Sequence, residues 1–323
     1  MEAHQHTKVH AFQSSVAGIT PPRRFTFPFH YTPHPLCVKA AEEVQAYLHH
    51  QTAWAEELQR GKMFGVLVVE TQTGELGYLA AFSGNLLGEN QWDFFVPPIY
   101  DLLRPGSYFP EEEQRISAIN QEIARLQTDP HYTQLRTEVE QIILTAEKEL
   151  HQAKHFLKTE KQRREALRQA GVDEATAKAL IQESQFQKAE YKRLERQWQA
   201  QLIEAQQALS AFEEQITALK QERKQRSAAL QQWLFEQYQV LNARGERKPL
   251  TEIFATTAQG TPPAGAGECA APKLLQYAYL HHLKPRCMAE FWWGDSPKQE
   301  IRQHGNYYPA CKGKCEPILG HML

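Results

Sequence analysis

Three cysteines toward the carboxyl end of the chain have the side chains and the spacing of a metal site. Cys269 begins a helical run behind the glycines of PAGAGEC, and Cys311 and Cys315 form a C-x3-C pair behind Pro309. Zinc prefers deprotonated sulfur ligands in a tetrahedron, and three thiolates leave the fourth position to water or another residue. The pattern predicts a zinc site at Cys269, Cys311 and Cys315. The alternative is three ordinary thiols in a reducing compartment, which a single C-x3-C pair does not exclude.

A second candidate site is a group of basic residues in the middle of the chain. The five expected to contact phosphate are Arg163, Arg164, Lys188, Lys192 and Arg193. Clustered lysine and arginine attract phosphates by charge, which is typical of a nucleic-acid-binding arm. The alternative is a solvated helical face whose cations pair with glutamates three or four residues away. The sequence leaves both readings open.

The composition limits the classes of function. The chain has 323 residues, of which 23% are charged, with a formal net charge of -2. This length allows two domains, or one domain with an elongated element. A near-neutral balance argues against a general polyanion binder and leaves room only for local basic patches. We find no apolar run of membrane-spanning length and no apolar signal core, and five cysteines in so long a chain favour a reduced, cytoplasmic protein.

Residues 111–243 have the composition of a long helical segment. They contain one proline, Pro130, and one glycine, Gly171, and their apolar residues recur at intervals of three and four. Pro130 predicts a kink or restart of the first helix, and Gly171 predicts a break near the middle. We therefore expect an antiparallel coiled-coil hairpin over 111–243, with its tip near 169–184.

The remaining residues predict a globular α/β body that this hairpin interrupts. A helix is expected over 36–60, and β-branched residues on both sides of a turn ending in glycine predict a β-hairpin over 62–82. Because the two ends of an antiparallel hairpin come together, 24–110 and 244–323 can form one body of α+β type. Residues 1–23 are polar and are expected to be a flexible tail.

Eight stretches of the sequence carry a family resemblance. They are RFTFPFHYTPHPLC, KMFGVLVVE, GYLAAFSG, FVPPIYD, ESQFQKAEYKRL, TPPAGAGECAAPKLLQYAYLH, MAEFWWG and YPACKGKCEPILGHML. Together they resemble the N-terminal half of a bacterial subgroup of long RluA-type pseudouridine synthases. In that family a catalytic domain follows, with a His-Arg-Leu-Asp segment whose aspartate attacks the target uridine, and this sequence has no such segment. The resemblance implies an RNA-binding accessory region without catalytic residues, whose partners are ribosomal or transfer RNA and the catalytic domain in cis or trans.

A second, local resemblance concerns the cysteines. A helix, a β-hairpin, the GECAAPKLL segment, a strand and P-x-C-x3-C are similar to the zinc-dependent cytidine-deaminase fold, and by position Cys269, Cys311 and Cys315 match its three ligands. The family's proton-shuttling glutamate would stand at position 271, which is Ala271. Glu268 precedes the ligand, and nothing in the sequence places Glu290 at the site. The resemblance therefore implies a deaminase-like scaffold with a structural zinc and without deaminase activity.

Three functions are consistent with these observations. The leading expectation is the RNA-binding accessory region of an RluA-like pseudouridine synthase, with Trp292 and Trp293 either buried or lining a base pocket. The first alternative is a zinc-dependent nucleobase deaminase with a displaced acid, which bound zinc and released ammonia would reveal. The second is a coiled-coil adaptor for a protein partner, which would show no salt-dependent binding of RNA.

Overall fold

The computed structural model describes residues 8–26, 28–30, 32–298 and 300–323. The chain divides into two compact units: Met1–Glu113 with Ala228–Leu323, here the α+β unit, and Gln114–Ser227, here the helical unit. The helical unit thus interrupts the α+β unit in sequence, with limits at 114 and 227 where the sequence suggested 111 and 243. Both expected halves of the body, 24–110 and 244–323, contribute to the α+β unit.

The core of the α+β unit is a five-stranded antiparallel sheet with the strand order β1-β3-β2-β6-β7. Its strands are β1 (His10–Ala11), β2 (Lys62–Glu70), β3 (Leu76–Phe82), β6 (Lys284–Trp293) and β7 (Tyr307–Tyr308). The expected hairpin over 62–82 is confirmed as β2 and β3, because Phe64 pairs with Phe82 and Glu70 with Leu76. Gly74 has a φ of +84°, which suits glycine, at the turn between them.

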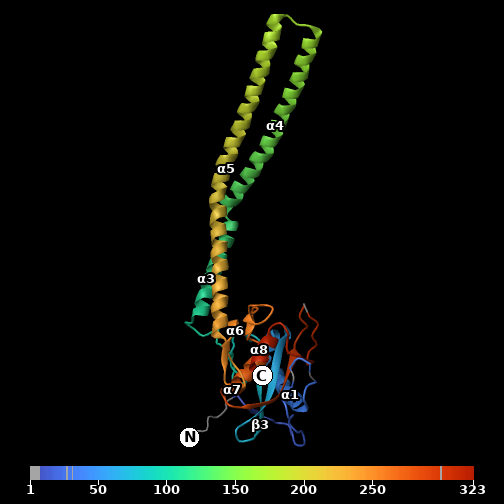
Figure 1. Cartoon of the computed structure of the whole chain (residues 1–323), viewed down its shortest axis with the longest axis vertical. Helices are drawn as coiled ribbons and strands as arrows, with labels where there is room; N and C mark the ends of the chain where they lie inside the picture. Colours follow the sequence, from blue (N-terminus) through green and yellow to red (C-terminus); the bar gives the residue numbers. More distant parts are fainter. Residues whose placement is uncertain (1–7, 27, 31, 299) are drawn as a thin grey trace. The chain divides into compact units, whose positions relative to one another are not determined.

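Helices cover both faces of this sheet (Figure 1). Successive residues of β2 point to opposite faces: Val66 and Val68 join the cluster of α1 (Pro35–His50), and Leu67 joins that of α7 (Ala270–Leu280). All three side chains are fully buried. Each contributes on the order of 1.5–3 kcal/mol by leaving water, so the central strands are fixed in register.

Shorter elements complete the α+β unit. They are η1 (Thr52–Trp54), α2 (Ala55–Gln59), β4 (Gln239–Leu241), β5 (Arg247–Pro249), α6 (Leu250–Ala255) and α8 (Cys315–Met322). Of the expected tail over 1–23, residues 1–7 lie outside the described residues. His10 and Ala11 pair with β3, and the His10 ring lies 2.8 Å from the carbonyl oxygen of Phe94, so this segment packs on the sheet edge.

The helical unit consists of the last part of α3 (Tyr108–Gln127), the whole of α4 (Pro130–Ala170) and most of α5 (Glu174–Gln237). The expected break at Pro130 is confirmed, and the Asp129 side chain caps the new helix by accepting from the backbone N–H of His131 at 2.8 Å. Gly171, with a φ of +89°, ends α4 before α5 begins at Glu174.

Side-chain contacts pair these helices in opposite directions (Figure 1). Arg223 donates to Asn120 at 3.4 Å, and the indole of Trp198 donates to Glu149 at 3.1 Å. Close to Gly171, Arg163 pairs with Glu183. As the residue number on α3 and α4 increases, the number of its partner on α5 decreases. The helices therefore run antiparallel. Ile123, Leu126 and Ile216 form a buried cluster between α3 and α5.

The structure establishes a mostly helical α+β protein. The finer descriptions, a deaminase-like fold and a coiled-coil hairpin, stay predictions. In the described part of the chain, every helix is too short or too polar to cross a membrane.

Candidate metal centre

Cys269 is placed at the start of α7 by the glycines before it. It has an extended backbone, with φ -69° and ψ 156°, and directly precedes Ala270, the first helical residue. Gly267 has a φ of +87°, and a Cβ atom there would lie 2.7 Å from the ring of Tyr238. Only glycine allows this close approach. The glycine-rich segment therefore places the Cys269 thiol at the N-terminus of α7.

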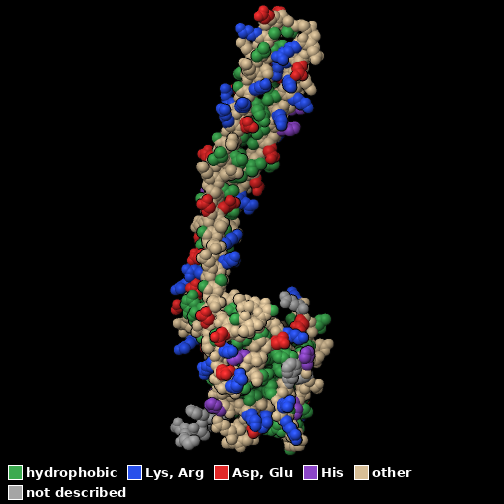
Figure 2. Space-filling model, in the orientation of Figure 1, with side chains coloured by type: hydrophobic (Ala, Val, Ile, Leu, Met, Phe, Trp, Pro, Cys, Tyr) green, Lys and Arg blue, Asp and Glu red, His purple; other side chains and the backbone are tan. Residues whose placement is uncertain are grey.

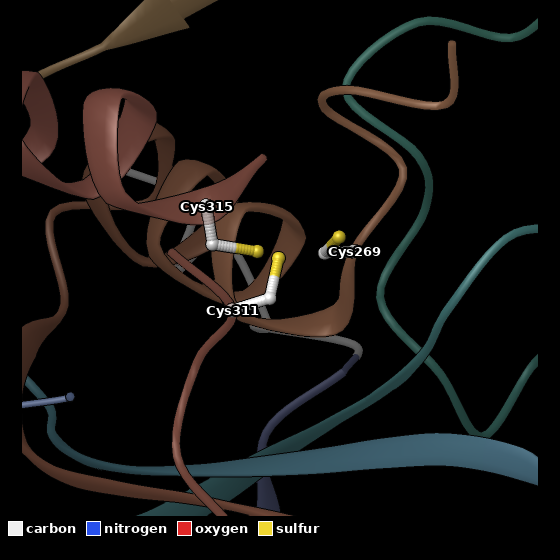
Figure 3. Close-up of side chains that lie close together, drawn as sticks. All are labelled: Cys269, Cys311 and Cys315. Atoms are coloured by element: carbon white, nitrogen blue, oxygen red, sulfur yellow. The ribbon is translucent and has the colours of Figure 1, made fainter. Parts of the chain in front are cut away.

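Cys311 and Cys315 belong to one tight turn at the start of α8. The backbone N–H groups of Cys315 and Glu316 both donate to the carbonyl oxygen of Cys311 at 3.2 Å. This turn brings the two side chains together opposite Cys269, as Figure 3 shows. The three Sγ atoms lie within 4.8 Å of one another; Cys269 is half-buried, Cys311 exposed and Cys315 buried.

These three thiols interact strongly. The hydrogen bond with Cys269, and then that with Cys315, lowers the pKa of the Cys311 thiol. The hydrogen bond with Cys311 raises the pKa of Cys269, and the hydrogen bond with Cys269 raises the pKa of Cys315. A cluster of soft sulfur donors at this separation can hold a metal ion. The site thus brings together the three predicted ligands and leaves out Cys37 and Cys287, which are buried on the opposite side of the sheet.

Glu290 reaches the same place from the sheet. It lies on β6, opposite Gly65 of β2 and Tyr308 of β7, and its side chain is buried. Its Oε1 accepts a hydrogen bond from the backbone N–H of Ala271 at 3.3 Å. Burial raises the pKa of the Glu290 carboxyl to about 7, because the charged form loses water. A Cβ on Gly65 would lie 3.0 Å from the Cβ of Ala270, so this glycine allows α7 to lie against the sheet beside Glu290.

A cavity of about 310 Å³, here the metal cavity, opens beside the cysteines. Glu290, Trp292 and Arg302 line it together with the three thiols. The guanidinium of Arg302 lies 5.3 Å from the ring centroid of Trp292 and 5.2 Å from that of Tyr308. It also pairs with Glu300 at 2.7 Å. A cation held between two aromatic rings and a carboxylate is a fixed feature of the wall.

The arrangement has the parts of a site for metal-assisted chemistry. Three thiolates leave a metal with an open position, and in zinc enzymes that position holds water or substrate. A buried carboxyl lines the adjoining cavity and can accept or donate a proton. Glu290, Cys311 and Trp292 therefore place a buried carboxyl, a candidate metal ligand and a flat aromatic ring around one small space.

Glu268, the other acid near the first ligand, is engaged elsewhere. It accepts a hydrogen bond from the Tyr238 hydroxyl at 3.3 Å and lines a separate hollow of about 50 Å³ with Lys273. The Lys273 ammonium donates to the carbonyl oxygens of Phe82 and Gly84 at 3.0 and 2.9 Å. Burial lowers the pKa of Lys273 to about 8. The Glu268 side chain is thus bonded to Tyr238, and Lys273 connects α7 to the end of β3.

Several lining residues of the metal cavity were not anticipated from the sequence, Arg302 and Ser83 among them. Arg302 comes from the loop between β6 and β7, and Ser83 follows β3. Ser83 lies in the GYLAAFSG stretch and Arg302 in none of the quoted stretches. Nothing in the sequence places either residue at the cysteines, because only the pairing of β2 with β3 and β6 brings these segments to one place. Of the two tryptophans, Trp293 is buried with the α1 cluster, whereas Trp292 is half-buried and lines the cavity.

The five basic residues named from the sequence separate into three kinds. Arg163 pairs with Glu160 and Glu183, and Arg193 pairs with Glu190. Arg164 and Lys188, in contrast, line one groove of about 690 Å³ in the helical unit. Lys192 is exposed and is not among the residues that line this groove.

Comparisons with family models, curated proteins and solved structures found no match to this chain. Its function is therefore inferred from the residues and the geometry described above.

Proposed function

We propose that the chain is the RNA-binding accessory region of an RluA-like RNA pseudouridine synthase. Ribosomal or transfer RNA is the bound partner, and a catalytic domain in cis or trans converts uridine to pseudouridine. The observation that carries this proposal is the metal cavity, because its 310 Å³ and its Trp292 wall suit one flat ring. An unpaired base stacks on Trp292, within reach of the polar groups of Glu290 and Arg302.

The proposed metal is zinc, held by Cys269, Cys311 and Cys315. Three sulfur donors favour zinc over hard cations, which prefer oxygen. Bound to these ligands, zinc links the start of α7 to the turn at the start of α8. It thereby holds in place one side of the cavity in which the base binds. In this proposal the α+β unit is deaminase-like and the helical unit is an antiparallel coiled-coil arm.

Base binding is tested by replacing Trp292 with alanine in the full chain. Stacking of one base contributes about 1–3 kcal/mol, so Trp292→Ala should weaken binding of a single-stranded RNA oligonucleotide by roughly 5- to 150-fold. Fluorescence anisotropy measures this change. Tyr108→Ala removes an aromatic ring that is 41% exposed and outside the cavity, and it should leave the affinity unchanged. Equal binding by Trp292→Ala and the unmodified chain would reject the proposal.

A second candidate is a zinc-dependent nucleobase deaminase, favoured by Glu290. The sequence predicts an inactive scaffold because position 271 is alanine, but the Glu290 carboxyl lies against the backbone of that residue and lines the cavity. Zinc would supply an activated water, and Glu290 would transfer its proton to the leaving nitrogen.

Ammonia release from cytidine- and adenosine-containing oligonucleotides tests this candidate. We expect Glu290→Gln to abolish release while the metal content of the protein stays the same. The amide keeps an oxygen that accepts from Ala271, so this variant isolates proton transfer from folding. A metal-loaded chain that releases no ammonia from either oligonucleotide contradicts the deaminase function and leaves the RNA-binding proposal in place.

A further inference from the structure

The groove in the helical unit, here the basic groove, is lined mostly by positively charged side chains. Its cationic side chains are Lys154, Lys158, Lys161, Arg164, Arg168 and Lys188. His151 and His155 line it as well, and Glu165 is its single acidic residue. Six cations against one carboxylate make this groove strongly positive in a chain whose formal net charge is -2.

Most of this charge is not neutralised by neighbouring acids. Lys161 lies 3.8 Å from Glu165, and the buried Arg164 lies 3.8 Å from Glu183. Within the part of the chain that the structure describes, the other four cations of the groove have no carboxylate within 4.0 Å. An exposed cation without such a partner is available to a phosphate, and Figure 2 shows Lys and Arg side chains gathered along α4 and α5 toward the turn that joins them.

The spacing of the cations follows a chain of phosphates. Lys154, Lys158, Lys161 and Arg168 lie on one helix, and the first and last are about 21 Å apart at 1.5 Å per residue. Lys188 contributes from α5 on the facing side. Arg164 is held in place by a hydrogen bond to Gln187 at 2.5 Å, while the exposed lysines are flexible point charges. Such a row suits a backbone of repeated charges better than a single small anion.

We infer that the basic groove binds the phosphodiester backbone of RNA, through Lys154, Lys158, Lys188 and the cations beside them. This inference rests on the proposed RNA-binding function and gives it a second contact surface, separate from the metal cavity. The groove contacts phosphates without reading the base sequence, because point charges at its wall recognise charge and spacing alone.

An anionic membrane is a poorer ligand for the same charges. Peripheral membrane binding combines basic residues with apolar side chains that enter the lipid. Leu157 is the one aliphatic side chain that lines this groove, and it is half-buried. The lining of the groove thus offers charge without an exposed apolar anchor, which favours a hydrated polyanion. Phe156 and Phe186 are exposed on the same two helices, so vesicle binding is the alternative outcome that the experiment has to exclude.

A pair of triple variants tests the groove in the full chain. Lys154→Gln, Lys158→Gln and Lys188→Gln together remove three charges that line it. Arg196→Gln, Lys220→Gln and Lys224→Gln remove three charges from α5 outside it, and all six side chains are exposed. Binding of a single-stranded RNA oligonucleotide is measured by fluorescence anisotropy over a series of salt concentrations, and circular dichroism verifies that helix content is unchanged.

The groove variant should lose about two units of the slope of log K against log salt, since each phosphate contact contributes roughly 0.7. At about 0.1 M salt this equals an approximately 100-fold loss of affinity, equal for oligonucleotides of different sequence. The control variant should keep most of the slope. Equal losses in the two variants, or no loss in the groove variant, would overturn the inference while the base-binding proposal stands.

Two further outcomes separate this inference from the proposed function. If the unmodified chain binds no RNA, both are overturned. If vesicles of phosphatidylcholine and phosphatidylserine bind the chain through these lysines while RNA does not, the groove is a membrane surface and the inference fails. If Trp292→Ala weakens RNA binding and the groove variant does not, base binding alone is supported.

Discussion

The Oε1 atom of Glu290 accepts a hydrogen bond from the backbone N–H of Ala271 at 3.3 Å. Strand β6 therefore delivers a carboxyl to the turn of helix where the deaminase resemblance expects a glutamate and where the sequence has alanine. The side chain comes from a position 19 residues later in the chain. Packing of α7 on the sheet thus places the Glu290 carboxyl beside Ala271, and Glu290 and the three cysteines line one cavity.

Removal of one thiol should remove the metal. Cys315→Ser replaces a buried sulfur of the cluster by a poorer zinc ligand, so we expect metal content to fall from about one zinc per chain to near zero. Elemental analysis of the purified protein measures this. Cys37→Ala, which alters a buried thiol on the opposite side of the sheet, should keep the zinc. Equal zinc in both variants would mean that the ion binds elsewhere.

Lys273 should make stability depend on pH. Its pKa is about 8 in the folded chain against 10.5 for the free side chain, so between these values the unfolded state binds more protons. The free energy of unfolding should therefore rise with pH across this window, by about 1.4 kcal/mol per unit.

Lys273→Met lacks this group and serves as the reference. In this variant the carbonyl oxygens of Phe82 and Gly84 lose their donor at every pH. That loss lowers the free energy of unfolding by the same amount at each pH. Urea denaturation at pH values from 7 to 10 gives the difference between the two proteins. A difference that does not change with pH would show that Lys273 stays charged throughout.

Gly294 should tolerate no side chain. Its φ is +104°, and a Cβ atom there would lie 2.1 Å from the carbonyl oxygen of Leu58. Gly294→Ala should destabilise the protein by roughly 3 kcal/mol or more, because backbone has to move at the start of the loop that carries Arg302. Thermal denaturation compares it with Gly305→Ala in the same loop, where the space is open and the cost is about 1 kcal/mol. Similar melting temperatures for the two variants would contradict this packing.

The buried cluster of the helical unit should hold its helices together. Ile216 is 5% exposed against Ile123 and Leu126. Ile216→Ala should cost roughly 2–4 kcal/mol, so helix content should be lost at a lower temperature. Leu144→Ala is the matched control, because that side chain is 66% exposed and should change the transition little. Far-UV circular dichroism follows both, and a larger effect at Leu144 would refute the arrangement.

Local sequence was sufficient for several features. The break at Pro130 and the end of α4 at Gly171 follow from backbone chemistry, since proline lacks an N–H and glycine adopts positive φ. The hairpin of β2 and β3 was expected from β-branched residues around a turn. The trio of Cys269, Cys311 and Cys315 was identified from residue type and spacing, although the two segments are more than forty residues apart.

The tertiary structure decided which partners the charged side chains have and which residues line the cavity beside the cysteines. Arg163 and Arg193 each have an acid three residues away, so their pairing is visible in the sequence, but the burial of Arg164 against Gln187 depends on contact between α4 and α5. Glu290 and Arg302 reach the cysteines only through the register of β2, β6 and β7. Short-range preferences act along the chain and can be predicted from it, whereas register and helix contact are set by the burial of many side chains together.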